Sequence, residues 1–416
     1  MTTEVAHAVA RYAERFHAAA GDRHTVASPL GAWLLLALCG SAVKDAADGG
    51  RTNKSAAGEE LAAVLGMELA EAAAAAKALL QDPHPLVPGA AAVWHQPGRA
   101  TDALLEWGAT LPATTATGPL PAPAELNEWA RVNTLDLIDK FLVPASPGTL
   151  LVMASALATR ISWAIPFGVA PARALGRASE WAGRLTRVLR SPDEGHKSFI
   201  ASTDRAGDVV VHITDAEAGG SRKPGLFVVS VAAVPDVAPA DVLAVAHDIA
   251  LSRGDSRRSL FDLPLGESAL WTITEEPVLT RASDGREERY RAVLPCWSAN
   301  DEHDLSSAGL GFPAATRVLA PLLGATGPDF KAKQSTMAKY GRYGFEAAAL
   351  TGFSVMESVP EEGVARTAEL RFGHPYAVVA VATDYRSSDS TGPWHGLPVF
   401  SAWVCEPEDV PESEAA

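Results

Sequence analysis

The sequence contains residue types that carry out chemistry, but few of them stand at the spacing that a reaction needs. His303 lies between acidic residues in the stretch DEHDL (301–305), where a carboxylate could orient a base or help to bind a metal. We favour the simpler interpretation of an exposed loop histidine. The stretch GLGFPA (309–314) partly matches a dinucleotide-binding fingerprint, but it follows a polar loop and contains Pro313, so we interpret it as a tight turn.

Other catalytic and metal-binding signatures are missing from the sequence. It has no GxSxG nucleophile turn, no GxxxxGK[ST] phosphate loop and no HExxH zinc motif. Its three cysteines, Cys39, Cys296 and Cys405, show neither a CxxC pair nor Cys/His metal spacing, which favours buried or idle thiols. We therefore expect no catalytic residue, no metal and no cofactor, and we do not expect an enzyme.

The charge balance narrows the classes of partner. With 35 basic and 50 acidic residues the net charge is −15, so the protein repels nucleic acid and anionic membranes. The cluster Arg253, Arg257 and Arg258 is interpreted as a solvated helix end. Residues 1–21 form an amphipathic helical pattern instead of a signal sequence, and no run of about 18 apolar residues occurs. We expect a cytoplasmic monomer.

The order of the expected elements indicates an α+β fold. Helical patterns dominate the first third of the chain, with a buried helix after Ser28 and another over 125–142. Strand patterns follow: LLVMASALATRISWAIPF, DVVVHITDAE, GLFVVSVAAV, ALWTITEEPV, RYRAVLP and YAVVAVATD. Helices before strands are typical of an α+β architecture. We expect one domain over 1–405 and a disordered acidic tail over 406–416.

The stretch from Tyr340 to Pro360 contains too many glycines for a stable helix and has the alternation of a strand. Its first face is apolar apart from one threonine: Phe345, Ala347, Ala349, Thr351, Phe353 and Val355. Its second face comprises Glu346, Ala348, Leu350, Gly352, Ser354 and Met356. The next stretch, PEEGVARTAE, is typical of a solvated loop. A strand with one face that could be buried would therefore lie next to an exposed loop.

Several segments resemble the serpin family, in the family's order and over most of the chain. The stretch LNEWARVNTLDLIDKFL resembles the serpin pattern N-x-W-x-x-x-x-T-x-x-x-I through four residues: Asn127, Trp129, Thr134 and Ile138. VASPLGAWLLLAL resembles the Ser-Pro-Leu start of the family's second helix, and AVLPCWSANDEHDL resembles a later strand and turn. FGHPYAVVAVATD and GLPVFSAWVCEP look like the C-terminal hairpin, although Ala402 replaces a glycine.

The long apolar strand also resembles a serpin signature. In LLVMASALATRISWAIPF, Trp163 and Phe167 match the family's tryptophan and final Pro-Phe, while Ser155 stands where serpins usually have asparagine. The likeness is to a bacterial-type, intracellular serpin. It implies three β-sheets, about eight or nine helices and an exposed reactive-centre loop over about 342–372.

The stretch GFEAAALTGF lies where serpins carry the hinge Gly-Thr-Glu-Ala-Ala-Ala-Ala-Thr. Six residues match: Gly344, Glu346, Ala347, Ala348, Ala349 and Thr351. By resemblance, a protease attacks the loop, forms an acyl-enzyme and is trapped when the severed loop inserts as a new strand in the main sheet. Phe345 and Leu350 depart from the hinge pattern. Without a cavity for Phe345, overpacking slows insertion; with one, the ring becomes an anchor.

The family's spacing from Gly344 also places the reactive bond at Ser358–Val359, with Glu357–Ser358 and Met356–Glu357 as neighbouring candidates. No lysine or arginine occurs between Gly344 and Arg366, which disfavours a trypsin-like target. A bond as late as Arg366–Thr367 stays open.

Three functions remain open. The first is a suicide inhibitor of serine proteases, or of cysteine proteases, and the second is a non-inhibitory serpin-fold protein that binds a ligand or partner. The third is a hydrolase or other enzyme on the same scaffold. Loop cleavage separates the first two, because insertion adds a strand and raises the melting temperature.

Overall fold

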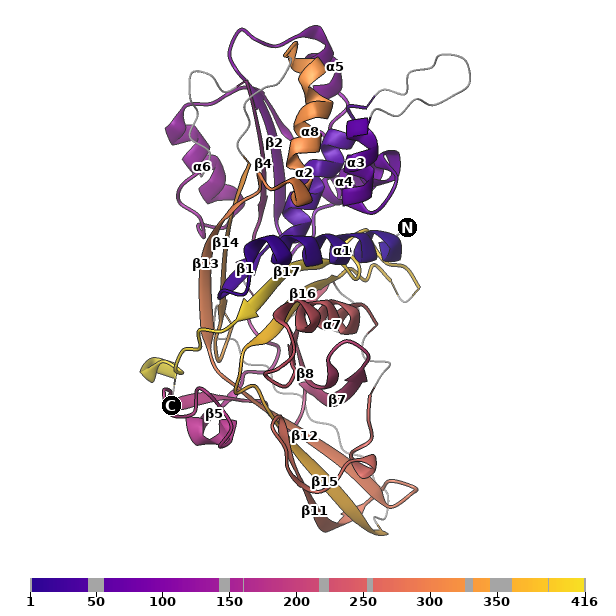
Figure 1. Cartoon of the computed structure of the whole chain (residues 1–416), viewed down its shortest axis with the longest axis vertical. Coiled ribbons are helices and arrows are strands. Elements are labelled where there is room, and N and C mark those ends of the chain that lie inside the picture. Colours follow the sequence, from indigo (N-terminus) through magenta and orange to yellow (C-terminus); the bar gives the residue numbers. More distant parts are fainter. Residues whose placement is uncertain are drawn as a thin grey trace.

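The structure is a computed structural model, and it describes residues 2–43, 56–141, 150–159, 161–216, 224–252, 257–325, 332–344, 361–387 and 389–414. The molecule is longer than it is wide (Figure 1). Most helices gather at one end with two sheets, and an extended β-arm projects at the other end. The mixture of helices and sheets confirms the predicted α+β class.

The helices surround a central helix that is apolar on every side. The described residues form α1 Thr2–Ala20, α2 Pro29–Gly40, α3 Ala56–Leu65, α4 Leu69–Gln81, α5 Asp102–Gly108, α6 Pro123–Asn133, α7 Pro239–Ser252 and α8 Phe312–Leu319. Every residue of α2 is buried. As the sequence predicts, the Ser28 hydroxyl caps α2 by accepting from the Gly31 N–H, and Pro29 occupies the first turn.

One sheet of six strands forms the middle of the molecule. Its order is β1–β17–β16–β9–β8–β7, and its strands are β1 Thr25–Ala27, β7 Lys197–Thr203, β8 Gly207–Asp215, β9 Gly225–Ala232, β16 Tyr376–Thr383 and β17 Pro398–Val404. Helix α7 packs on one face of this sheet. The other face belongs to the main core around α2. Nearly all residues of β9, β16 and β17 are therefore buried.

The second six-stranded sheet includes the arm. Its order is β10–β11–β15–β12–β6–β5, and its strands are β5 Gly168–Pro171, β6 Arg187–Arg190, β10 Gly266–Glu267, β11 Trp271–Thr280, β12 Arg286–Leu294 and β15 Glu361–Arg371. Strand β15 lies between β11, which is antiparallel to it, and β12, which is parallel to it. It therefore has a hydrogen-bonding partner on both edges.

Two smaller sheets stand beside α2. One has the order β3–β2–β4, with β2 Gly89–His95, β3 Ala116–Pro119 and β4 Leu151–Leu157. The other pairs β13 Trp297–Asp304 with β14 Lys333–Tyr340. The side chains of β13 alternate strictly between buried and exposed.

Two predictions about element boundaries were wrong. The stretch PEEGVARTAE was expected to be a loop, but Glu361–Arg371 is strand β15. It forms a strand because β11 and β12, which are distant in the sequence, supply its hydrogen-bonding partners, and local sequence patterns do not indicate such partners. The helix expected over 125–142 ends at Asn133, because Leu135 and Asp136 have φ values of 55° and 61°, which no α-helix contains.

His303 and the stretch 309–314 also differ from the predictions. His303 is a buried side chain of β13 whose Nε2 donates to the Val26 carbonyl at 2.7 Å, so the expected exposed loop histidine is corrected. Its acidic neighbours Glu302 and Asp304 point to solvent by strand alternation. The expected tight turn is present only at Gly311, which has φ 82° and leads directly into α8.

The acidic tail is largely ordered, so the expected disorder of 406–416 is corrected for 406–414. The Asp409 carboxylate accepts from the Thr186 and Arg187 N–H groups at 2.7 and 2.8 Å. Val410 is buried, and the Glu408 N–H donates to the Cys296 carbonyl at 2.7 Å. Backbone pairing thus outweighs the tail's low hydrophobicity. That residues 1–405 are one domain stays a prediction.

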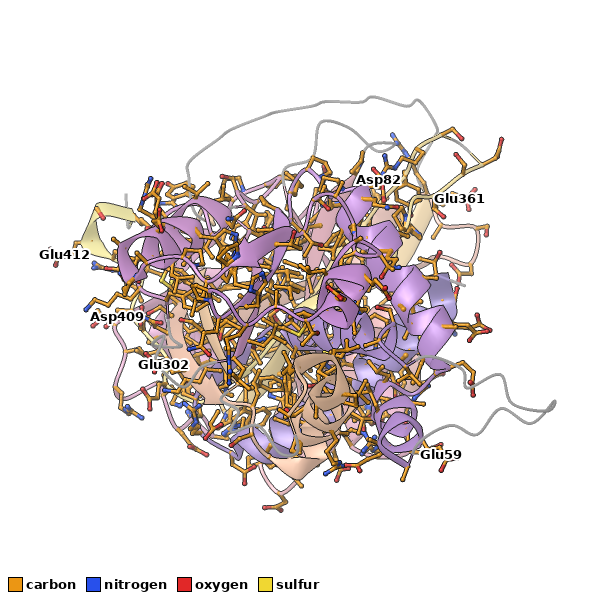
Figure 2. All side chains as sticks on the ribbon, turned by 90° about the horizontal axis from the view of Figure 1, so that it is seen from above. Glu59, Asp82, Glu302, Glu361, Asp409 and Glu412 are labelled. Carbon is orange, nitrogen blue, oxygen red and sulfur yellow. The ribbon has the colours of Figure 1, made fainter. Side chains whose placement is uncertain are left out.

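The acidic charge is distributed over the surface. Figure 2 shows labelled carboxylates around the periphery of the molecule: Glu59, Asp82, Glu302, Glu361, Asp409 and Glu412. In the part of the chain that the structure describes, no helix is long and apolar enough to cross a membrane. Within the same residues, no group of three or more His, Cys, Asp or Glu is arranged to hold a metal ion. Cys39 and Cys296 are buried free thiols, and Cys405 is a partly exposed one.

Buried histidines connect α1, α7 and the central sheet. His17 lies in α1 and bonds to the Ser401 hydroxyl at 2.7 Å, while neither ring nitrogen of His247 in α7 has a hydrogen-bond partner. Burial lowers the pKa of His17 to about 3, helped by His247 and His303, and burial lowers the pKa of His247 to about 4. Both side chains are therefore neutral in the folded protein at neutral pH.

These depressed values predict sensitivity to acid. In the unfolded chain both histidines bind a proton below about pH 6.5. In the folded protein His247 stays neutral down to about pH 4 and His17 down to about pH 3. The unfolding free energy that these neutral side chains contribute is therefore fully present above about pH 6.5 and decreases as the pH falls. Each group contributes about 1.4 kcal/mol per pH unit in that window. His247→Leu should reduce the loss of unfolding free energy between pH 6 and 5 by about that amount, measured by urea denaturation. The exposed His7→Leu is the control, and equal slopes for both variants would contradict the assignment.

Candidate functional site

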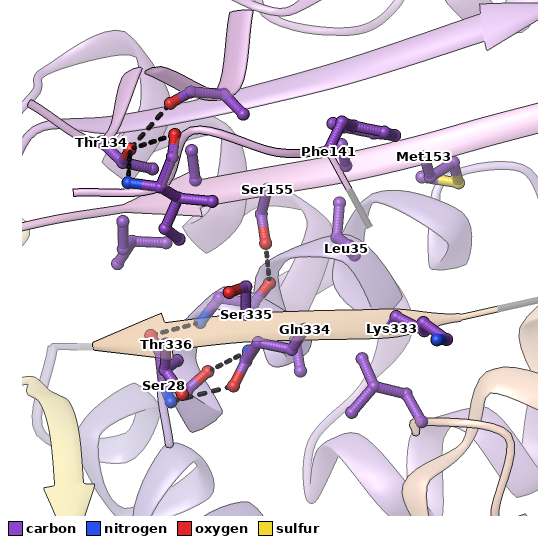
Figure 3. A pocket seen from close by; sticks show the side chains of 18 of the residues that line it. Ser28, Leu35, Thr134, Phe141, Met153, Ser155, Lys333, Gln334, Ser335 and Thr336 are labelled. Carbon is purple, nitrogen blue, oxygen red and sulfur yellow. Dashed lines mark hydrogen bonds between the residues drawn. The ribbon is translucent and has the colours of Figure 1, made fainter. Parts of the chain in front are cut away.

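The main site is a slot between β4 and β14. Among the described residues, β4 pairs only with β2, and β14 pairs only with β13, so each strand has one edge without a strand partner. Figure 3 shows the two strands as separate ribbons with side chains between them. An unpaired strand edge presents N–H and C=O groups that can accept another strand.

The slot has a floor and a cover made by two helices. A cavity of about 70 Å³ occupies it. Gly31, Ala32 and Leu35 of α2 line one side, and Trp129 and Ala130 of α6 line the other. The side chains of β4 alternate between these helices: Val152 and Ala154 join the cluster around Leu126 of α6, whereas Met153 and Leu157 pack on the core that contains α2.

The polar side chains in the slot bond to backbone, as Figure 3 shows. The Ser155 hydroxyl donates to the Gly31 carbonyl at 2.9 Å. Gln334 forms two bonds with the backbone of Ser28, at 2.8 and 3.0 Å (Figure 3). Outside that view, the Thr336 hydroxyl donates to the Val26 carbonyl at 2.7 Å. These groups fix the edges of the slot. No nucleophile–base pair lies among the residues that line it, so the slot suits the binding of extended chain better than catalysis.

A tryptophan closes one end of the slot. The indole N–H of Trp163 donates to the Gly341 carbonyl at 2.8 Å, and its backbone N–H donates to the Tyr343 carbonyl at 3.2 Å. Its ring packs against Tyr340 and Phe167, with centroid distances of 4.9 and 6.2 Å. The chain that follows β14 is thereby held against the chain that follows β4.

Phe167 joins this end of the slot to a pair of histidines, of which His212 is buried and His196 is partly exposed. Its ring lies 4.6 Å from the ring of His196 and 5.3 Å from that of His212. His196 Nε2 donates to the Ile165 carbonyl at 2.7 Å, so its Nδ1 accepts from His212 Nε2 at 3.1 Å. Burial lowers the pKa of both histidines, which keeps this arrangement neutral.

Gly344 lies at the start of the expected loop and is the last described residue before 345–360, and its position requires glycine. It pairs antiparallel with Ser162 and has φ 81°. A Cβ at this position would lie 2.3 Å from the Ile161 carbonyl oxygen, a contact that no side chain allows. The chain therefore leaves β14, turns, and starts back along the extension of β4.

The structure brings four of the predicted site residues to the slot. Gly344, Trp163 and Phe167 meet at its closed end, and Ser155 lies on its wall. Their assigned roles in loop insertion stay predictions. The remaining candidates lie outside the described residues: Phe345, Glu346, Ala347, Ala348, Ala349, Thr351, Met356, Glu357, Ser358 and Val359. Sequence reasoning did not find Gln334, Thr336 or the His196–His212 pair, because strand periodicity carries no sign of distant partners.

Removal of the Trp163 side chain should open the closed end of the slot. Trp163→Ala removes a fully buried ring and its bond to Gly341, so we expect the free energy of unfolding to fall by about 3 to 5 kcal/mol. Size-exclusion chromatography after warming should show oligomers. Trp163→Phe keeps most of the packing and should cost less. A Trp163→Ala protein with unchanged denaturation and no oligomers would contradict this assignment.

Comparison with solved structures identifies the fold of this chain. No protein-family model matches the sequence, and no curated protein matches it significantly. Solved structures do match: the thermophilic serpin tengpin in its native state (11% identity, TM-score 0.63, 97% of this chain and 94% of that chain) and AtSerpin1 of Arabidopsis in its native stressed conformation (15%, 0.62, 98% and 98%). Human thyroxine-binding globulin complexed with thyroxine matches similarly (12%, 0.60, 98% and 100%). The chain described here has the serpin fold.

Proposed function

We propose that this protein is a suicide inhibitor of serine proteases, or of cysteine proteases, which traps its target by inserting the cut loop between β4 and β14. The observation that carries the proposal is the slot itself: two unpaired strand edges, with Gly344 already paired to Ser162 at one end. A strand that continues from Gly344 finds hydrogen-bonding partners on both sides.

The existing pair supports a specific register for the inserted strand. If antiparallel pairing continues from Gly344 and Ser162, Ala349 comes opposite Leu157 and Val355 opposite Leu151. Opposed residues in such a pair point to the same face. Met153 and Leu157 face the core around α2, so the apolar face of the loop would be buried there.

The polar positions also correspond in this register. Thr351 is the one polar residue on the apolar face of the loop, and it comes opposite Ser155. Ser155 is the one polar residue of β4 that shares a face with Met153 and Leu157, and it already bonds to Gly31. A one-residue shift would bury Glu346 and expose Phe345, so the register is strongly favoured.

The position of β15 supports a requirement for cleavage. Insertion as far as Val355 carries that residue about 36 Å from Gly344, at about 3.3 Å per residue. The short stretch 356–360 then spans about 20 Å at most, whereas β15 begins at the outer end of the arm (Figure 1). Since β15 is held on both edges, the intact loop cannot fill the slot.

The structure argues against the latest candidate for the reactive bond. Arg366 and Thr367 lie inside β15, and the Arg366 guanidinium donates to the Leu260 and Leu263 carbonyls at 2.8 and 3.0 Å. A bond held inside a sheet does not fit the cleft of a protease. The proposed bond is therefore Ser358–Val359, or one of the two bonds before it.

A second candidate function is ligand or partner binding without inhibition. The similarity to thyroxine-binding globulin, which was solved complexed with thyroxine, favours it. Loop cleavage distinguishes the two functions, because a protein that only binds a ligand does not need its cut loop to insert.

Limited cleavage tests the proposed function directly. Exposure to elastase-like, subtilisin-like and glutamate-specific proteases should give an SDS-stable complex with at least one of them. Mass spectrometry after denaturation should find a C-terminal fragment that begins at Val359, or at Ser358 or Glu357. The cleaved protein should melt at a much higher temperature than the intact one. Cleavage without a complex and without this rise would favour the binding function.

Charge on the buried face of the loop should prevent trapping. In the proposed register, Ala347→Arg buries an unpaired guanidinium, which costs several kcal/mol, whereas the matched control Glu346→Arg places the same group on the other face. We expect both intact proteins to keep the wild-type melting temperature. Only Ala347→Arg should lose the SDS-stable complex, on gels run after equal exposure to protease. Normal trapping by this variant would show that position 347 does not insert.

A further inference from the structure

An apolar cavity lies under the closed end of the slot. Its volume is about 70 Å³. Side chains from the two slot edges and from the central sheet line it, among them Ile161, Trp163, Val228, Met337, Ala338 and Phe400. Two of its lining residues, Ile161 and Trp163, flank Ser162, which pairs with Gly344, the last described residue before 345–360.

The side chains around the cavity cannot close it. Trp163 is fixed by its bond to the Gly341 carbonyl and by its contact with the Tyr340 ring, so neither ring can swing inward. On the other sides the lining includes three alanines, Ala338, Ala380 and Ala402, which are too short to fill the space. Protein interiors are normally close-packed, and an apolar void loses the contacts of every atom that lines it. The cavity therefore favours an apolar occupant.

We propose that the cavity is the receptor for the aromatic ring of Phe345, the first residue to enter the slot after the loop is cut. This inference rests on the proposed loop insertion. Phe345 follows Gly344 directly, so the chain needs no further length to reach the cavity. Antiparallel pairing places Phe345 opposite Ile161, and Ile161 lines the cavity. The two side chains then share a face, which points the benzyl group inward.

The chemistry of the cavity suits a single aromatic ring. Its lining is almost entirely apolar, with Lys339 as the only charged residue. Enclosing a free benzene takes a dry cavity of about 150 Å³, so this cavity of about 70 Å³ would receive only part of the ring, and the rest of the side chain would lie between the slot edges. Phe345 then acts as an anchor that sets the register at the first inserted residue. The larger side chain thereby helps insertion instead of obstructing it.

The melting temperature of the loop-cleaved protein tests the proposal without a target protease. Loop cleavage by subtilisin should raise the wild-type melting temperature. For Phe345→Ala the cleaved form should melt about 4 °C lower than cleaved wild type, while the two intact proteins agree within about 1 °C. An unchanged cleaved form would overturn the anchor. If cleaved wild type shows no rise at all, the proposed insertion fails, which is a different result.

Filling the cavity provides an independent test. Ala380 lies on β16 and its side chain borders the cavity, so Ala380→Leu should occupy the space intended for the ring. We expect cleavage of this variant to give a smaller rise in melting temperature, and the double variant Ala380→Leu with Phe345→Ala to regain part of it. Losses that simply add in the double variant would show that Phe345 does not use this cavity. Melting of the intact Ala380→Leu protein shows whether the substitution itself is tolerated.

Discussion

The absence of strand pairing between β4 and β14 is the constraint on which the rest of the structure depends. Backbone N–H and C=O groups inside a protein are normally paired, and leaving one unpaired costs about 1 to 3 kcal/mol. Here two edges face each other across a slot with a helix on either side, and the described chain supplies no strand to join them. The backbone hydrogen bonds that a strand in the slot would form are therefore not made in the described chain. The residues around the slot must hold the two edges apart.

Helix α2 and its first turn supply much of that support. Because α2 is apolar on all sides, it packs against α4, β4 and β17 at once and forms a rigid floor. Ser28 connects the helix to both sides of the site: its backbone bonds to Gln334 of β14, and its hydroxyl donates to Val399 of β17 at 3.0 Å. Ser155 ties β4 to the same helix. The two edges are therefore positioned by one element.

The sequence predicted much of the fold because its strongest signals are local. The strands over 151–157, 207–215, 225–232 and 376–383 have continuous apolar or β-branched runs, and the resemblance to serpins depended on short motifs around Trp129 and Trp163. The errors came from segments that depend on distant partners. β15 is polar and contains Gly363, yet two strands hold it, and the acidic tail is ordered by bonds from Thr186 and Arg187. The slot itself could not be predicted, since period-two alternation shows which face is buried but not whether an edge is paired.

The way the chain returns to the core after the loop has a consequence for the cut molecule. β15 lies between β11 and β12, and β16 lies between β9 and β17, so the segment after a cut in 345–360 stays woven into two sheets. After a cut there the two fragments stay associated, so the product is a two-chain protein. Once such a particle unfolds, its pieces diffuse apart, and refolding becomes a second-order reaction that slows on dilution. A cut molecule that has unfolded therefore regains its fold less readily than an intact one.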